Sequence, residues 1–205
     1  MESRTKIMKP FLKCSKYIDY DNPEVDRTAR SLAQGTNYQS EVIQRCFEFV
    51  RDEIHHSWDY KQNPVTCRAS DVLHHRTGYC YAKSHLLAAL LRANGIPTGF
   101  CYQRLSVGES GPPYSLHGLN AVYLNGHGWY RIDARGNKPG VSAQFTPPTE
   151  SLAFHIREEG ERDFPEILAE PLLLIISTLE HYDTIEQVHQ NLPDLQSITG
   201  SQESS

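Results

Sequence analysis

The chain has 205 residues, of which 39% are hydrophobic and 22% charged, and its formal net charge at neutral pH is −5. That length favours one domain with an ample hydrophobic core over two large domains. A net negative chain without a basic stripe is an unlikely nucleic-acid binder, so nucleic acid is excluded as a partner. The first ten residues lack the apolar core of a secretory signal, and the longest apolar run, at 172–176, is too short to span a bilayer. We therefore expect a cytoplasmic protein with no membrane partner.

The cysteines form an odd and dispersed set without a CxxC pair. They are Cys14, Cys46, Cys67, Cys80 and Cys101. Such a set does not resemble the disulfide framework of a small secreted domain, and we expect reduced thiols.

The N-terminal half is mainly helical in pattern. Residues 6–20 could form an edge strand or an extended arm. A short helix is expected from Asn22, a good N-cap, to Gly35, a C-terminal glycine, with Pro23 at the first helical position. Apolar residues at helical spacing predict a second helix of about four turns from residue 40 onward.

A third main helix is expected to begin at or near Cys80 and to stop at Gly95 with Pro97 just beyond. A short helical turn over 70–78 precedes it. In the helix that begins near Cys80, one face is apolar and consists of Ala82, Leu86, Ala89, Leu90 and Ala93. Residues 98–107 then have the composition of a strand, and 108–115 that of a mobile loop.

Two further strands are expected over 116–124 and 128–134, joined through Asn125-Gly126, a strong hairpin signal. Near the C-terminus, Pro171 suits the start of a helix, and Thr184 with Gln187 forms a capping box for another. The order of helices, antiparallel strands and helices predicts an α+β fold in which the sheet packs against the helix that begins at Cys80.

Cys80 is the residue with the most suggestive setting. A cysteine at a helix N-terminus meets unpaired N–H groups and the positive end of the helix dipole, which favour the thiolate. Gly78 would let the backbone turn into the helix, and the N–H groups of Cys80 and Tyr81 could stabilise an oxyanion. The alternative is a small buried hydrophobic residue at a helix start.

A base for this thiol is available in the hairpin. His117 opens one strand and Asp133 closes the next, and a histidine oriented by a carboxylate is what a thiol nucleophile requires. A two-residue turn at Asn125-Gly126 would place the two side chains on opposite faces of the sheet. A three-residue loop that includes His127 would place them on the same face.

These residues resemble the transglutaminase-like superfamily, whose core has the α+β fold of the papain-like cysteine enzymes. The resemblance covers about 40–136 and rests on the order "GYCYAKSHLLAALLRANGIP", a histidine strand, and "GWYRI" ending in aspartate. It implies Cys80 as nucleophile, His117 as general base and acid, and Asp133 as its partner. The flanking segments are similar to those of small bacterial members.

The resemblance also implies the rest of the site and the domain plan. The substrate or oxyanion region would include Gly78, Tyr79, Tyr81 and Trp129, although such aromatic residues are also typical of a core. No cofactor is expected, and the substrate would be a protein, a peptide or a small amide. The domain would span 1–195, with a helical extension over 150–195 and a disordered tail over 196–205.

The chain differs from the calcium-dependent transglutaminases at several positions. It has Tyr81 where they have tryptophan, Gly118-Leu119 where they have alanine-tryptophan, and Ala134-Arg135 where they have proline-threonine. It also has no acidic DxDxDG loop, so no metal requirement follows. These differences argue against true protein crosslinking.

Two other functional classes are consistent with the sequence. One is a non-catalytic binding module on the same fold. The other is a zinc protein using Cys67, His74, His75 and Cys80, whose spacing matches none of the common zinc patterns. The acidic run over 158–163 favours a solvated face over a site for a basic substrate.

Overall fold

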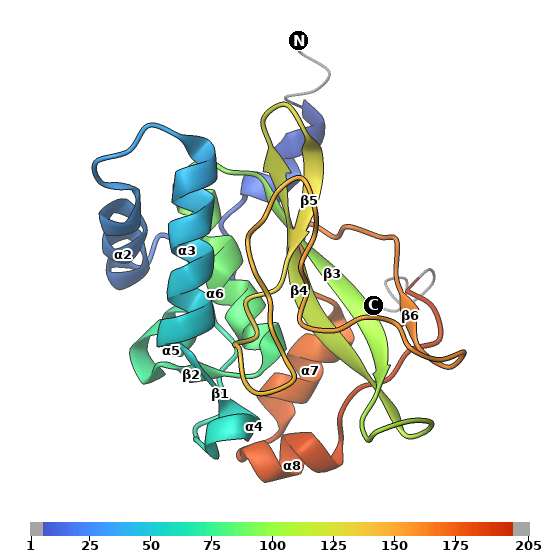
Figure 1. Ribbon diagram of the computed structural model, residues 1–205. Helices are drawn as coiled ribbons and strands as arrows, with labels where there is room; N and C mark the ends of the chain where they lie inside the picture. The colour runs from blue at the N-terminus through green and yellow to red at the C-terminus, as the bar shows by residue number, and fades with distance from the viewer. Residues whose placement is uncertain (1–5, 199–205) are drawn as a thin grey trace.

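The computed structural model describes residues 6–198, in which a layer of helices packs on a curved antiparallel sheet (Figure 1). The expected α+β fold is confirmed. The first part contains η1 (Lys9–Leu12), α2 (Pro23–Ala33), α3 (Gln39–Glu53), β1 (His55–His56), α4 (Ser57–Tyr60), α5 (Ala69–His75), β2 (Thr77–Gly78) and α6 (Cys80–Ala93). The second part contains β3 (Thr98–Ser106), β4 (Tyr114–Leu124), β5 (Gly128–Ile132), β6 (Arg162–Asp163), α7 (Leu173–His181) and α8 (Ile185–Gln190).

Helix α6 lies at the centre of the molecule, between α2, α3 and α5 on one side and strands β3 and β4 on the other (Figure 1). Every residue from Cys80 to Arg92 is buried. The sequence predicted a helix with one apolar face, but this helix is covered all round. The polar residues Lys83, Ser84, His85 and Arg92 are tolerated because each bonds a main-chain carbonyl.

The buried Lys83 ties α6 to the end of α3. Its ammonium group donates to the carbonyl oxygens of Ile54 and Arg51, where the negative end of the α3 dipole lies. Burial lowers the pKa of Lys83 to about 7. The first turns of α6 are therefore anchored to their neighbouring helix as well as to the sheet.

The main sheet has the strand order β5-β4-β3-β6, and all of its pairings are antiparallel. Strands β4 and β5 pair from Asn120 with Ile132 to Leu124 with Gly128. Three residues, 125–127, therefore form the hairpin loop, and the register places His117 and Asp133 on the same face. The three-residue alternative is confirmed, and the two-residue turn is excluded.

Several expected elements differ from those observed. The edge strand considered for residues 6–20 is wrong, because Lys9–Leu12 form a 3-10 helix followed by irregular chain. The short helix before Cys80 ends at His75, and Thr77–Gly78 instead form a strand parallel to His55–His56. Strand β6 has only two exposed residues, too few to give a period-two pattern in the sequence.

The C-terminal extension returns to the sheet and to the start of α6. Helix α7 follows Pro171 closely, and the capping box of α8 at Thr184 and Gln187 is confirmed. Of the expected tail, Ile198 is buried, residues 196 and 197 are exposed, and 199–205 lie outside the described residues. No helix within 6–198 is long and apolar enough to cross a membrane.

Arg92 provides a test of how the buried polar groups hold the layers together. Its guanidinium donates to the carbonyl oxygens of Thr98, Lys13 and Ala169, which belong to three separate segments. We expect Arg92→Met to lower the free energy of unfolding by about 3 kcal/mol or more, because it removes charge-assisted bonds and leaves buried carbonyls unpaired.

The measurement is urea denaturation, and the matched control is Arg30→Met. Arg30 pairs only with Asp26 on the exposed face of α2, so we expect its loss to cost less than about 0.5 kcal/mol. Equal costs for the two variants would contradict a structural role for Arg92.

Candidate active site

Cys80 is the first residue of α6 and lies at the base of a cleft of about 460 Å³. Tyr79, the N-cap residue, is extended and has no capping side chain, so the N–H groups of the first turn have no partner within the helix. The hydroxyl of Tyr79 donates to the carbonyl of Ile185 and joins α6 to α8. Cys80 remains 7% exposed, which leaves its sulfur reachable from the cleft.

Gly78 packs closely against the first turn of this helix. It pairs with His56 in the parallel β1–β2 ladder, and a Cβ at Gly78 would lie 3.1 Å from Cβ of Ala82 and 3.2 Å from Oγ1 of Thr66. The placement of Gly78 in a sharp turn at the oxyanion region is therefore corrected. It does not line the cleft, and it allows β2 and the first turn of α6 to pack closely.

His117 and Asp133 form a buried hydrogen-bonded pair, with 2.8 Å between Nε2 of the histidine and Oδ2 of the carboxylate. Asp133 is fully buried and also accepts the N–H groups of Arg135 and Ala153, each at 3.1 Å. Its carboxylate is thus fixed by three donors. The histidine is held in one orientation, with Nδ1 left for another partner.

Cys80 lines the same cleft as His117, and its charge contributes to raising the pKa of that histidine. The approach of α6 to β4 depends on Gly118, because a Cβ there would lie 2.9 Å from Cδ1 and 3.3 Å from Cα of Tyr81. The first turn of α6 therefore rests directly on the β4 backbone. The hydroxyl of Tyr81 donates to the carbonyl of Leu116 and fastens the two elements together.

The electrostatics of the His117–Asp133 pair favour the imidazolium and the carboxylate. Burial lowers the pKa of His117, but the negative charges of Asp133 and of a Cys80 thiolate outweigh it and raise that pKa to about 10. Burial raises the pKa of Asp133, but the charge and hydrogen bond of His117 and the two backbone donors hold it below its ordinary value. The buried pair is therefore held as an imidazolium beside a carboxylate.

The cleft is closed on the histidine side by a segment that the sequence pattern did not reveal. The ring of Phe154 meets the ring of His117 edge to face, with 5.0 Å between centroids. Phe154 also lines the cleft, so its ring packs beside His117 there. Residues 150–157 have no regular secondary structure beyond an isolated bridge, so no periodicity marked them.

A second group of charged residues lies beside the pair and was also missed. Asp59 accepts two hydrogen bonds from the guanidinium of Arg135, at 2.6 and 3.2 Å, and one from Lys138 at 2.7 Å. His56 is buried, with Nδ1 3.6 Å from the same carboxylate, and burial lowers its pKa. Asp59 lies on the four-residue helix α4, within a segment that read as irregular.

The expected aromatic residues divide between two places. Tyr79 and Tyr81 line the cleft, whereas Trp129 does not. The expectation for Trp129 is corrected: it packs against Phe11 of η1, with 4.8 Å between ring centroids, and against Tyr123. The physical reason is its place near the turn of the hairpin, about 20 Å along the strands from the open end where His117 lies.

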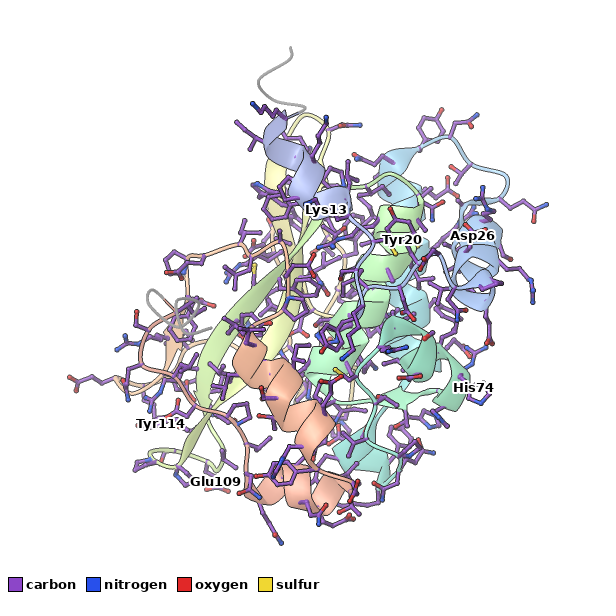
Figure 2. All side chains as sticks on the ribbon, turned by 180° about the vertical axis from the view of Figure 1, so that it is seen from behind. Lys13, Tyr20, Asp26, His74, Glu109 and Tyr114 are labelled. Atoms are coloured by element: carbon purple, nitrogen blue, oxygen red, sulfur yellow. The ribbon has the colours of Figure 1, made fainter. Side chains whose placement is uncertain are left out.

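The zinc alternative has no support in the geometry. Among residues 6–198, no group of three or more histidine, cysteine, aspartate or glutamate side chains is placed to hold a metal ion. His74 and His75 are exposed at the end of α5, where Figure 2 shows His74 at the outer edge of the molecule. The carbonyl of Cys67 instead accepts a bond from the buried ring of His85.

Residues 26–134 match the family model of the transglutaminase-like superfamily, and this range contains Cys80, His117 and Asp133. The chain belongs to the transglutaminase-like superfamily. The match covers more than half of the chain and begins in α2, upstream of the expected core. None of the curated proteins matches this member of the superfamily.

Solved structures with a similar fold come from several bacteria. They include a proposed cysteine protease from Cytophaga hutchinsonii (23% identity, TM-score 0.48, 62% of this chain and 41% of that one) and the periplasmic domain of TgpA from Pseudomonas aeruginosa (21%, 0.47, 60% and 45%). A proposed protease from Parabacteroides distasonis is also similar (13%, 0.43, 67% and 26%). This superfamily member thus spans less than half the length of those chains.

The role of Gly118 can be tested with a single added methyl group. We expect Gly118→Ala to slow iodoacetamide alkylation of Cys80 at neutral pH by about tenfold, because the new Cβ would push the first turn of α6 away from His117. Gly108→Ala is the control, since that glycine also lines the cleft but has open space around it. Equal alkylation rates in the two variants would show that close contact at Gly118 is dispensable.

The His117–Asp133 pair should give the protein a specific pH dependence of stability. The pKa of His117 rises from 6.5 to about 10 on folding, so its stabilising contribution is complete below pH 6.5 and is lost as the pH rises toward 10. We expect the free energy of unfolding of the parent to exceed that of His117→Gln most at pH 6, and the difference to shrink by pH 10. Urea denaturation at four pH values measures it; a constant difference would mean that no such charged pair forms.

Proposed function

We propose that the protein is a cysteine enzyme that attacks amide or peptide carbonyls through Cys80, with His117 as general acid and base and Asp133 as the residue that orients it. The observation that supports this most directly is the cleft that Cys80 and His117 both line, with His117 bonded to Asp133 at 2.8 Å. The side chains come from the start of α6, from β4 and from the residue after β5. Membership of the transglutaminase-like superfamily supports the same chemistry.

In the first half of the reaction, the Cys80 thiolate adds to the carbonyl carbon and the carbonyl oxygen becomes an oxyanion. The N–H groups of the first turn of α6 are the donors placed to stabilise it, because they lack partners within the helix. The His117 imidazolium gives its proton to the leaving nitrogen. The carbon–nitrogen bond then breaks, ammonia or an amine departs, and a thioester on Cys80 remains.

In the second half, neutral His117 removes a proton from the acyl acceptor as it attacks the thioester. Water as the acceptor gives a carboxylic acid, and an amine gives a new amide. Collapse of the tetrahedral intermediate restores the thiolate and the imidazolium. Asp133 stabilises the imidazolium at both stages, which is the reason for burying it with three donors.

The proposal applies to protein, peptide or small amide substrates and needs no cofactor for these steps. The cleft volume of about 460 Å³ accommodates a side chain and its neighbouring backbone but leaves most of a protein substrate outside. The geometry supports attack on an accessible amide, by hydrolysis or by transfer to an amine. Both reactions share the thioester.

The experiment is the pH dependence of iodoacetamide alkylation at Cys80, followed by peptide mass spectrometry in the parent and in His117→Ala. We expect the parent rate to reach its plateau near neutral pH or below, and His117→Ala to lose that plateau. Cys14 is the internal reference because it is exposed. Partial burial of its thiol and the neighbouring Asp21 raise its pKa.

An activated Cys80 would justify a screen of glutamine, peptide and amide substrates, with Cys80→Ala as the inactive control. Slow labelling of Cys80 with the same pH profile in His117→Ala would contradict the proposal. The protein would then be a non-catalytic binding module on the same fold.

A further inference from the structure

The charged side chains that line the cleft around Cys80 are mainly cationic. They include Arg135, Lys138 and Arg157, and the one acidic residue among them is Asp59. The whole chain has the opposite balance, with a net charge of −5. A positive cleft in a negative protein concentrates the field at the place where substrate enters.

The charge of Asp59 is already neutralised by two of these cations. Arg135 uses both arms of its guanidinium on the carboxylate, and Lys138 contributes one further bond at 2.7 Å. One carboxylate facing two cations leaves an excess positive charge. Lys138 places this positive charge in the cleft, because its side chain is 41% exposed. Its ammonium group has two donors left after the bond to Asp59.

Arg157 supplies a second cationic position from a different segment. Its side chain is 60% exposed, and its guanidinium donates one hydrogen bond, at 3.3 Å, to Oε1 of Glu161. Glu161 itself faces inward and accepts the backbone N–H groups of Arg157 and Ser106 at 2.8 and 3.1 Å. Arg157 therefore keeps guanidinium donors available to a ligand in the cleft.

In the acidic run over 158–163, Glu161 contacts Arg157, and Glu158 and Asp163 bind other groups. Like Glu161, Glu158 binds main chain, accepting from Gly111 at 2.5 Å and from the Ser106 hydroxyl, and Asp163 pairs with Arg131 at 2.8 Å. Glu158 and Glu161 hold the β3–β4 connection, near which Figure 2 labels Glu109 and Tyr114. The solvated face expected from the sequence is therefore wrong for Glu158 and Glu161.

We propose that this cleft selects an acyl donor with negative charge beside the attacked amide: an acidic peptide segment in which glutamine or asparagine is flanked by aspartate or glutamate. Lys138 and Arg157 would bind the flanking carboxylates, and Cys80 would attack the carboxamide between them. Charge-assisted bonds at both ends would fix the register of the peptide and raise its rate of association. This inference rests on the proposed function and specifies its substrate class.

Iodoacetate and iodoacetamide test the field of the cleft without a known substrate. The two reagents alkylate thiols by the same displacement of iodide and are similar in size, but only iodoacetate is anionic. The quantity measured is the ratio of their rates at Cys80 divided by the same ratio at Cys14 in the same chain. The His117 imidazolium also attracts the anion, so the informative result is the change caused by removing Lys138 and Arg157.

We expect Lys138→Gln and Arg157→Gln each to lower the normalised ratio by about threefold at low ionic strength, and the double variant by about tenfold. The matched control is Arg162→Gln, because Arg162 lies on β6 outside the cleft and donates to the carbonyl of Gln196. The ratio should be unchanged in this control. In 0.5 M salt, the differences among the variants should largely vanish.

The outcomes distinguish a failure of the proposed substrate class from a failure of the proposed cysteine-enzyme function. Cys80 could alkylate rapidly while the normalised iodoacetate-to-iodoacetamide ratio is the same in the parent and the double variant. That result would overturn the acidic substrate class and leave the cysteine-enzyme proposal intact. Failure of Cys80 to react with iodoacetamide in the folded protein would overturn both. Circular dichroism of each variant verifies that the fold is retained.

A peptide experiment then tests recognition directly. Glutamine peptides with glutamate or lysine neighbours are compared by kcat/KM for ammonia release. We expect the parent to prefer the acidic peptide by at least about tenfold, and the double charge reversal Lys138→Glu with Arg157→Glu to invert the preference. A parent that prefers the lysine peptide would contradict the inference.

Discussion

The close contact between α6 and β4 at Gly118 is the constraint on which the site depends. Because position 118 has no side chain, the backbone of Tyr81 rests on the strand, and Cys80 and His117 line the same cleft. The helix is held there from several directions, by Lys83 on the end of α3, by Tyr79 on α8 and by the sheet. A nucleophile and a base on separate elements need this kind of over-determined packing to hold their geometry.

The second requirement is a carboxylate that stays charged in a buried place. Asp133 meets it through three hydrogen bonds, one from His117 and two from the main chain of its own and a distant segment. The residue that donates one of them, Arg135, continues outward to bind Asp59. The orientation of His117 is thus connected through backbone and side chain to the charged wall of the cleft.

Charge is distributed unevenly over the molecule. The acidic residues that make the chain net negative are absent from the cleft wall apart from Asp59, and two acidic side chains near it, Glu158 and Glu161, bind main-chain N–H groups instead. The cations Lys138 and Arg157 keep exposed side chains. A linear count of charges hides such a separation, because it depends on which way each side chain points.

The sequence by itself determined the local features. Helix starts at Asn22 and Thr184 followed from capping chemistry, and the α+β order followed from the sequence of helical and alternating patterns. The superfamily followed from the order of the cysteine helix, the histidine strand and the aspartate. These signals depend on residues near one another in the chain, and short-range physics is enough to read them.

Tertiary structure alone decided how these local features combine. The three-residue hairpin loop places His117 and Asp133 on the same face of the sheet. The sequence was compatible with this loop and with a two-residue turn, which would have placed them on opposite faces. The distance of Trp129 from the cleft and the presence there of Asp59, Phe154 and Arg157 also came from the fold. The last three lie on a single helical turn or in irregular segments, which carry no periodicity. Only the packing of α6 on the sheet places them beside Cys80.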